Sequence, residues 1–69
     1  MDWHSTRTRE ELLIALEGRV RVERQAHGRI SAMALAAGYS LFLSSRTLHR
    51  VVNRSRRAAR YIYITAPVK

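Results

Sequence analysis

Apolar and polar positions alternate along most of this chain, in short segments separated by turn-forming residues. Residues 19–24 read Arg-Val-Arg-Val-Glu-Arg, which is the strict alternation of a half-buried strand. Residues 60–65 are rich in β-branched and aromatic side chains, and Pro67 follows them. Turn signals recur roughly every ten residues, a rhythm typical of β-sandwiches and small barrels. The pattern predicts six strands, at 10–17, 19–25, 29–36, 40–44, 48–53 and 59–66.

Two of these segments also carry local helix signals. Thr8 and Glu11 have the spacing of a capping box, which favours a helix over 9–17. The alanine-rich segment 30–37 is followed by a glycine, as many helices are. The alternating neighbours and the regular turn spacing nevertheless favour strands at both places. An all-β fold is therefore expected, and helices over both segments would refute it.

The first predicted strand is apolar on both of its faces. Leu12, Ile14 and Leu16 alternate with Leu13 and Ala15. Because successive side chains of a strand point to opposite sides, both sides must be covered. One side would face the interior, and a partner would cover the other. We therefore expect a homodimer, for which two-fold symmetry is the simplest closure.

The length and composition limit what this chain can be. It has 69 residues, no cysteine and 46% hydrophobic residues, which indicates one domain over 1–69 without disulfides. Domains of about this size bury only about 60% of their surface, so a bound ion, a tight core or a second subunit must add stability. The chain contains neither a long apolar run nor a signal-peptide pattern, so we expect it in the cytoplasm.

The positive charge is concentrated in the second half of the chain. Residues 1–35 contain six basic and five acidic side chains, whereas residues 36–69 contain seven basic and none acidic. Every basic residue except Lys69 is arginine. Such asymmetry is a hint of a polyanionic partner such as nucleic acid. The one dense run of arginines, in residues 54–60, falls on a predicted turn, where solvated charge is common.

Six residues stand at spacings that together resemble the two motifs of the cupin family: His4, Glu11, Gly18, Gly38, His49 and Asn53. The family motifs are roughly G-x5-H-x-H-x3-4-E-x6-G and G-x5-P-x-G-x2-H-x3-N. The resemblance spans nearly the whole chain. It implies a cupin-like double-stranded β-helix, a jelly-roll barrel of about six antiparallel strands whose N-terminal strands are missing.

The resemblance also implies a metal site. Cupins bind a divalent metal such as Fe, Mn, Ni, Cu or Zn through histidines and a carboxylate. Residue by residue, the ligand positions fall on His4, Glu11 and His49, and Thr6 stands where the family has another histidine. Two imidazoles and one carboxylate would still form a facial triad, which suits non-haem iron.

Several departures from the family pattern affect this site. Ser44 and Arg46 replace a proline and a glycine, and an arginine leaning toward the barrel mouth would disfavour a cation there. His4 is expected to fray, because it lies so near the start of the chain. Any metal should thus depend more on Glu11 and His49. The alternatives are a solvated Glu11 paired with a neighbouring arginine and a His49 satisfied by a backbone carbonyl or water.

Three functions follow as hypotheses. The first is a cupin-like protein with a degenerate metal or small-molecule site and little catalysis; if it is an enzyme, the resemblance implies a metal-dependent oxygenase or isomerase. The second is a DNA-binding module, because residues 30–40 resemble the first helix and turn of arabinose-regulator-type activators and residues 45–57 would supply a basic recognition helix. The third is a purely structural β-domain that dimerises.

Overall fold

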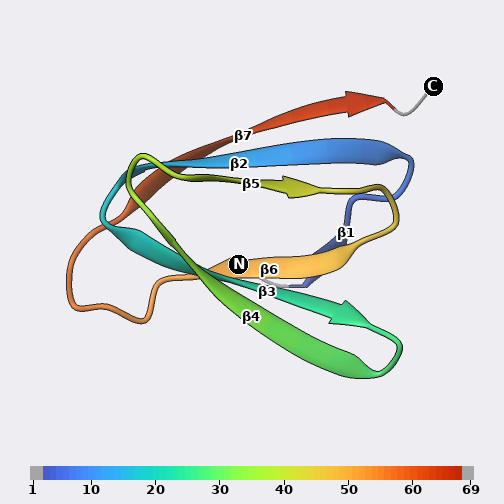
Figure 1. The fold of residues 1–69 in the computed structure, drawn as a ribbon, viewed down its shortest axis with the longest axis horizontal. Helices are drawn as coiled ribbons and strands as arrows, with labels where there is room; N and C mark the ends of the chain where they lie inside the picture. The colour runs from blue at the N-terminus through green and yellow to red at the C-terminus, as the bar shows by residue number, and fades with distance from the viewer. Residues whose placement is uncertain (1–2, 68–69) are drawn as a thin grey trace.

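The computed structural model describes residues 3–67, and it contains strands and turns but no helix in that range (Figure 1). The seven strands are β1 (His4–Ser5), β2 (Arg9–Glu17), β3 (Arg19–Ala26), β4 (Arg29–Ala36), β5 (Ser40–Leu43), β6 (Leu48–Val52) and β7 (Arg60–Pro67). The six expected strands are confirmed to within one or two residues at each end. The pattern missed only β1, whose two residues are too few to show a period.

The strands form two antiparallel sheets that face each other. One has the order β1-β6-β3-β4 and the other β5-β2-β7. A hairpin joins β3 to β4 within one sheet, whereas the other connections between the described strands carry the chain from one sheet to the other, and the one from β2 to β3 consists of Gly18 alone (Figure 1). The expected all-β fold of antiparallel strands is confirmed, and the two sheets do not close into a barrel. The long strand β7 is left at the edge of its sheet.

Both segments with helix signals are strands. Residues 9–17 form β2 and residues 29–36 form β4, which pairs with β3 along its entire length. Because alanine is only weakly disfavoured in strands, pairing with β3 outweighs local helix propensity. The helix-turn-helix hypothesis therefore loses its basis, since its first helix would have coincided with β4.

The core lies between the sheets and is small. Its buried apolar side chains are Leu13, Ala15, Val20, Val22, Leu35, Leu43 and Val51. The expectation that β2 is apolar on both faces is met: Leu13 and Ala15 are buried, whereas Leu16 is 49% exposed. Phe42 and Tyr63 lie outside this core, at 53% and 61% exposure.

The tight turn at Gly18 lets β2 lead directly into β3. Gly18 has a φ of 72°, and a Cβ atom at this position would lie 2.7 Å from the carbonyl oxygen of Ala58. Gly28 has nearly the same φ, 74°, but a Cβ atom there would meet nothing within 4 Å. The two glycines therefore share the conformational requirement but differ in crowding.

We expect Gly18→Ala to destabilise the protein clearly more than Gly28→Ala. Both substitutions place a Cβ in the left-handed region, which costs about 1–2 kcal/mol. Gly18→Ala adds a clash with backbone, and overpacking typically costs about 1–3 kcal/mol more. Chemical denaturation of both variants measures the difference. Equal losses of unfolding free energy would show that the contact with Ala58 is unimportant.

Candidate metal centre

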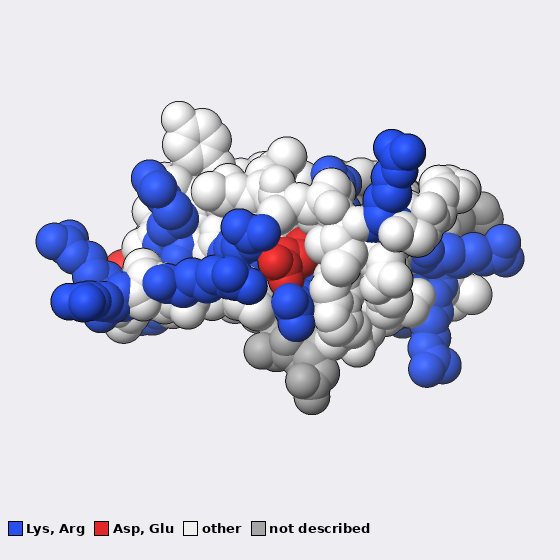
Figure 2. All heavy atoms as spheres, turned by 90° about the horizontal axis from the view of Figure 1, so that it is seen from below, with Lys and Arg blue, Asp and Glu red and all other residues white. Residues whose placement is uncertain are grey.

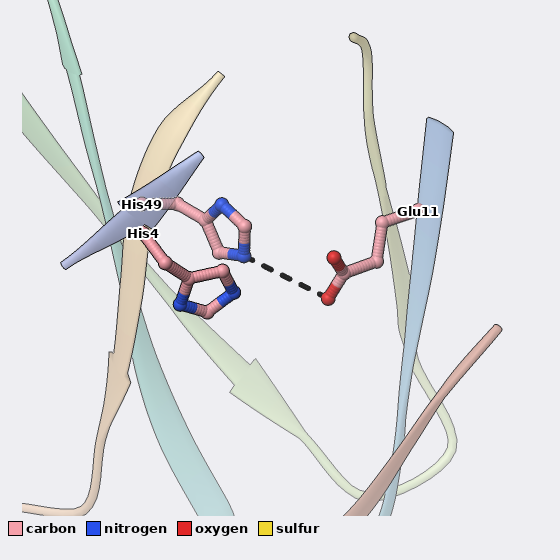
Figure 3. A group of neighbouring side chains, drawn as sticks. All are labelled: His4, Glu11 and His49. Atoms are coloured by element: carbon pink, nitrogen blue, oxygen red, sulfur yellow. Dashed lines mark ion pairs between the residues drawn. The ribbon is translucent and has the colours of Figure 1, made fainter. Parts of the chain in front are cut away.

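Three potential metal ligands come together between the two sheets. His4 of β1 and His49 of β6 are direct partners in the antiparallel register, so their side chains lie on the same face of their sheet. Glu11 of β2 projects toward them from the opposite sheet (Figure 3). The structure thus brings together all three residues proposed as ligands. His4 is part of a paired strand, so the expected fraying is not what the structure shows.

The three side chains are close, but not yet at metal-binding separations. One ligand atom from each residue can be chosen so that all lie within 4.8 Å of one another. His49 Nε2 is 3.7 Å from Glu11 Oε1, and the two imidazole rings meet edge to face at 4.2 Å between centroids. Adjacent ligands of a metal with bonds of about 2.1 Å lie roughly 3 Å apart. Binding therefore requires a contraction of about 1 Å, and His4, the exposed member, is best placed to move.

The surroundings of His49 fix its hydrogen-bonding state. The ring is fully buried, and Nδ1 is 3.1 Å from the carbonyl oxygen of Thr47. A carbonyl only accepts, so Nδ1 carries the proton and donates it. In the neutral ring Nε2 then presents its lone pair toward Glu11. Many metal-binding histidines are oriented by this kind of bond to a carbonyl.

Nε2 of His49 has no hydrogen-bond partner. Among residues 3–67 it is the one buried side-chain nitrogen or oxygen atom in this condition. A buried polar atom without a partner costs free energy, so such atoms usually mark a missing ligand, ion or water. Glu11 faces it with 7% exposure, which contradicts the alternative of a solvated acid paired with a neighbouring arginine.

Thr6 stabilises the turn beside the site instead of contributing an imidazole. Its hydroxyl donates to the carbonyl oxygen of Ser44 at 2.8 Å and accepts from the backbone N–H of Thr47 at 2.9 Å. Arg46 lies in the same turn, is exposed, and does not line the cavity around the candidate ligands. Because Arg46 is exposed and lies outside this cavity, its position does not support the expected repulsion of a cation at the site.

The arginine near the candidate ligands is Arg9. A cavity of about 280 Å³ is lined by His4, Ser5, Thr6, Arg9, Glu11, Tyr63 and Thr65. Arg9 Nε donates to the hydroxyl of Thr65 at 3.2 Å, which holds the guanidinium at the wall. The sequence reasoning missed Arg9, although its position two residues before Glu11 on one strand places both on the same face.

Tyr61 lies at the periphery of this centre. Burial chiefly raises the pKa of its phenol, and the negative charges of Glu11 and Tyr63 raise it further. The phenol thus stays protonated at neutral pH and offers no anionic oxygen to a metal. A cation bound at Glu11 would offset part of this effect, so the Tyr61 pKa would fall on metal binding.

No protein-family model matches this sequence, and comparison with curated proteins and with solved structures finds no match. None of the described residues forms a helix that is long and apolar enough to cross a bilayer. The case for a function therefore depends on the geometry of the chain itself.

Proposed function

We propose that this protein is a small cupin-like protein that binds a divalent transition metal through His4, Glu11 and His49. The observation that carries the proposal is the buried Nε2 of His49, which lacks a partner and faces a buried carboxylate 3.7 Å away. A metal ion would satisfy both groups at once. A protonated His49 paired with Glu11 would also satisfy them, and the experiment below separates these two states.

The strand order supports the jelly-roll part of the proposal. A jelly roll has eight strands in two four-stranded sheets that arise from two Greek keys. The order β1-β6-β3-β4 with β5-β2-β7 is that arrangement without its first strand, which would lie next to β7. Arg46 stands at the glycine position of the second cupin motif and has a φ of 59°, the conformation that favours glycine.

The donor set indicates which metals fit. Two imidazoles and one carboxylate suit Fe, Mn, Ni, Cu and Zn, and leave coordination positions for an external molecule. When bound, the metal would supply a Lewis acid to that molecule. The carbonyl of Thr47 orients His49, and β2 holds Glu11 in the opposite sheet. His4 would complete the set by shifting toward them.

The cavity favours a small anionic ligand. Arg9 contributes a fixed positive charge, and Tyr63 and Thr65 contribute hydroxyl groups. Glu11 is the only carboxylate among the described lining residues, and it would be occupied by the metal. Apart from the three candidate ligands, the described lining residues offer only the phenol of Tyr63 for proton transfer, so we assign the site to binding rather than rapid turnover.

Thermal unfolding of metal-free protein in the presence of each divalent ion tests this function. A ligand at about 100 times its Kd stabilises by about 2.7 kcal/mol, and each kcal/mol shifts the Tm of such a domain by about 4–8 °C. We expect a rise of roughly 10 °C or more with at least one of Fe(II), Mn, Ni, Cu or Zn. Elemental analysis of protein purified without an affinity tag identifies the ion. An unchanged Tm under saturating ions would leave the His49–Glu11 ion pair as the correct state.

Dimerisation is a second proposed role, supported by a different surface. The outer face of the β5-β2-β7 sheet carries five apolar side chains that are neighbours in the register, Leu12, Ile14, Phe42, Ile62 and Ile64, and the half-exposed Leu16 follows at the register shift of β2. We call this surface the apolar outer face. Phe42, Ile62 and Ile64 are 53%, 43% and 54% exposed. Contiguous apolar surfaces of this kind commonly mark protein interfaces, and we propose that a second copy of the chain covers it.

A further inference from the structure

The outer face of the other sheet is strongly basic. It belongs to β1, β3, β4 and β6, whose only acidic residue is Glu23. Figure 2, which views the molecule from the side of β3, β4 and β6, shows blue side chains around one small acidic area and continuing toward one end. The two outer faces of the sandwich are therefore different in kind: one is apolar and one is cationic.

Three arginine side chains surround the carboxylate of Glu23. Arg21 Nε is 2.9 Å from its carboxylate, Arg54 Nη2 is 3.8 Å away, and Arg50 makes a short contact. Hydrogen bonds from Arg50 and Arg21 lower the pKa of Glu23, so the carboxylate is ionised at neutral pH. Glu23 is only 3% exposed because these side chains cover it on the surface of the sheet. One negative charge cannot neutralise three guanidinium groups, so a net positive charge remains.

Two adjoining hollows run from this cluster to the loop between β6 and β7. The first, of about 180 Å³, is lined by Arg19, Val20, Arg21, Ala32, Met33, Ala34, Arg54 and Ser55. The second, of about 490 Å³, is lined by Gly18, Arg19, Ala36, Ala37, Ser55 and Arg57. Arg19 and Ser55 line both, so the two form one groove. Its base contains the small side chains of β4, which let a ligand approach the backbone.

The loop that provides Arg54 and Arg57 is held by its own hydrogen bonds. Asn53 Nδ2 donates to the carbonyl oxygen of Arg57 at 2.8 Å, and Asn53 Oδ1 accepts from the N–H of Ser55 at 3.0 Å. These bonds use the carbonyl oxygen of Arg57 and the N–H of Ser55, so the guanidinium of Arg57 is left for an external partner. The backbone that carries these arginines is therefore already ordered, which reduces the entropy cost of binding.

We propose that this groove, lined by Arg19, Arg21, Arg54 and Arg57, binds the phosphodiester backbone of single-stranded nucleic acid. Arginine is the residue best suited to phosphate because its planar donors can bind two oxygens together. None of the described residues that line the groove is aromatic, so binding should depend on phosphates instead of base stacking and be independent of sequence. Its small apolar side chains provide no anchor for a lipid bilayer, which disfavours a membrane.

Fluorescence anisotropy with labelled 20-nucleotide dT and U strands tests this proposal. With three or four phosphate contacts, the logarithm of the affinity should fall with the logarithm of salt concentration with a slope of roughly −2 to −3. The triple variant Arg19→Gln, Arg54→Gln, Arg57→Gln should reduce that slope by about 2 and weaken binding at 50 mM salt about tenfold or more. Glutamine retains the main-chain bonds of the loop, and circular dichroism verifies folding.

A matched control has the same net charge. Arg7, Arg29 and Arg46 are exposed and lie in or beside the turns at the opposite end of the sandwich (Figure 1). Their triple replacement by glutamine should leave affinity and salt slope nearly unchanged. If both triple variants weakened binding equally, the loss of net charge alone would explain the effect, and the proposal would be overturned. So would a wild-type protein that does not bind either strand at 50 mM salt, or that binds only vesicles of anionic lipid.

Discussion

Replacing His49 or Glu11 by alanine should abolish metal binding, whereas replacing His4 should only weaken it. Glu11 and His49 are buried on strands of opposite sheets, and the Thr47 carbonyl fixes the His49 ring. Ligands held this firmly contribute most to affinity. His4 is exposed and lies on a two-residue strand, so a water molecule can replace it at lower cost. The expected result is no bound Fe, Mn or Zn in the first two variants and partial retention in the third.

Conservative variants and a control separate metal binding from folding. Alanine at position 49 leaves a cavity, so Glu11→Gln and His49→Gln should be measured as well because they preserve volume. Both should lose the rise in Tm with metal, whatever their Tm without it. His27→Ala removes an exposed histidine in the turn between β3 and β4 and should bind normally. Retention of metal by His49→Gln, or its loss in His27→Ala, would contradict the assignment.

The sequence predicted the strands well because their pattern is local. The alternation appears in the structure over residues 19–22, with Val20 and Val22 buried and Arg19 and Arg21 exposed, and it ends at Glu23, which is buried beneath arginine side chains. Turn positions followed from the glycines, all three of which have positive φ. Whether the two sheets close into a barrel could not be predicted in this way, because closure depends on pairing between distant edges, which no local pattern encodes.

The candidate site could be predicted in part. Motif spacing identified His4, Glu11 and His49, and the register pairing of His4 with His49 explains why that spacing works. Its position two residues before Glu11 could have indicated Arg9, but the hydrogen bond of Arg9 to Thr65 in β7, distant in sequence, could not be predicted. Thr6 was treated as a missing ligand, but its bonds to the turn of Ser44 and Thr47 become visible only in three dimensions.

The positive charge could be assigned to a particular face of the protein only once the fold was known. The sequence showed that one half of the chain is rich in arginine, but it did not show which arginines share a surface. Because β3 contributes Arg21 and Glu23 while β6 contributes Arg50, the sheet register decides which charges meet. The same register places the apolar positions of β2, β5 and β7 together on the other outer face. Solvent would be excluded from one face by a second copy, while the other remains available to a polyanion.

Ile64→Glu should convert the protein from a dimer to a monomer. Ile64 is 54% exposed and lies on the edge strand β7, where it is the register partner of Leu12 on the central strand of the apolar outer face. In a two-fold dimer formed through this face, residue 64 of both copies would be buried in the interface. Two carboxylates would then be buried without partners, at about 3–5 kcal/mol for each uncompensated charge, which corresponds to at least a roughly hundredfold weaker dimer.

Ile30→Glu is the matched control. Ile30 is the same residue type, is 60% exposed and lies on β4, outside the apolar outer face. It makes the same change in charge and removes a similar exposed side chain, so this variant should remain dimeric. Sedimentation velocity at tens of micromolar, on the order of ordinary assay concentrations, measures both variants beside the wild type, since oligomerisation depends on protomer concentration. A monomeric wild type, or a dimer that Ile64→Glu does not disturb, would exclude the apolar outer face as the interface.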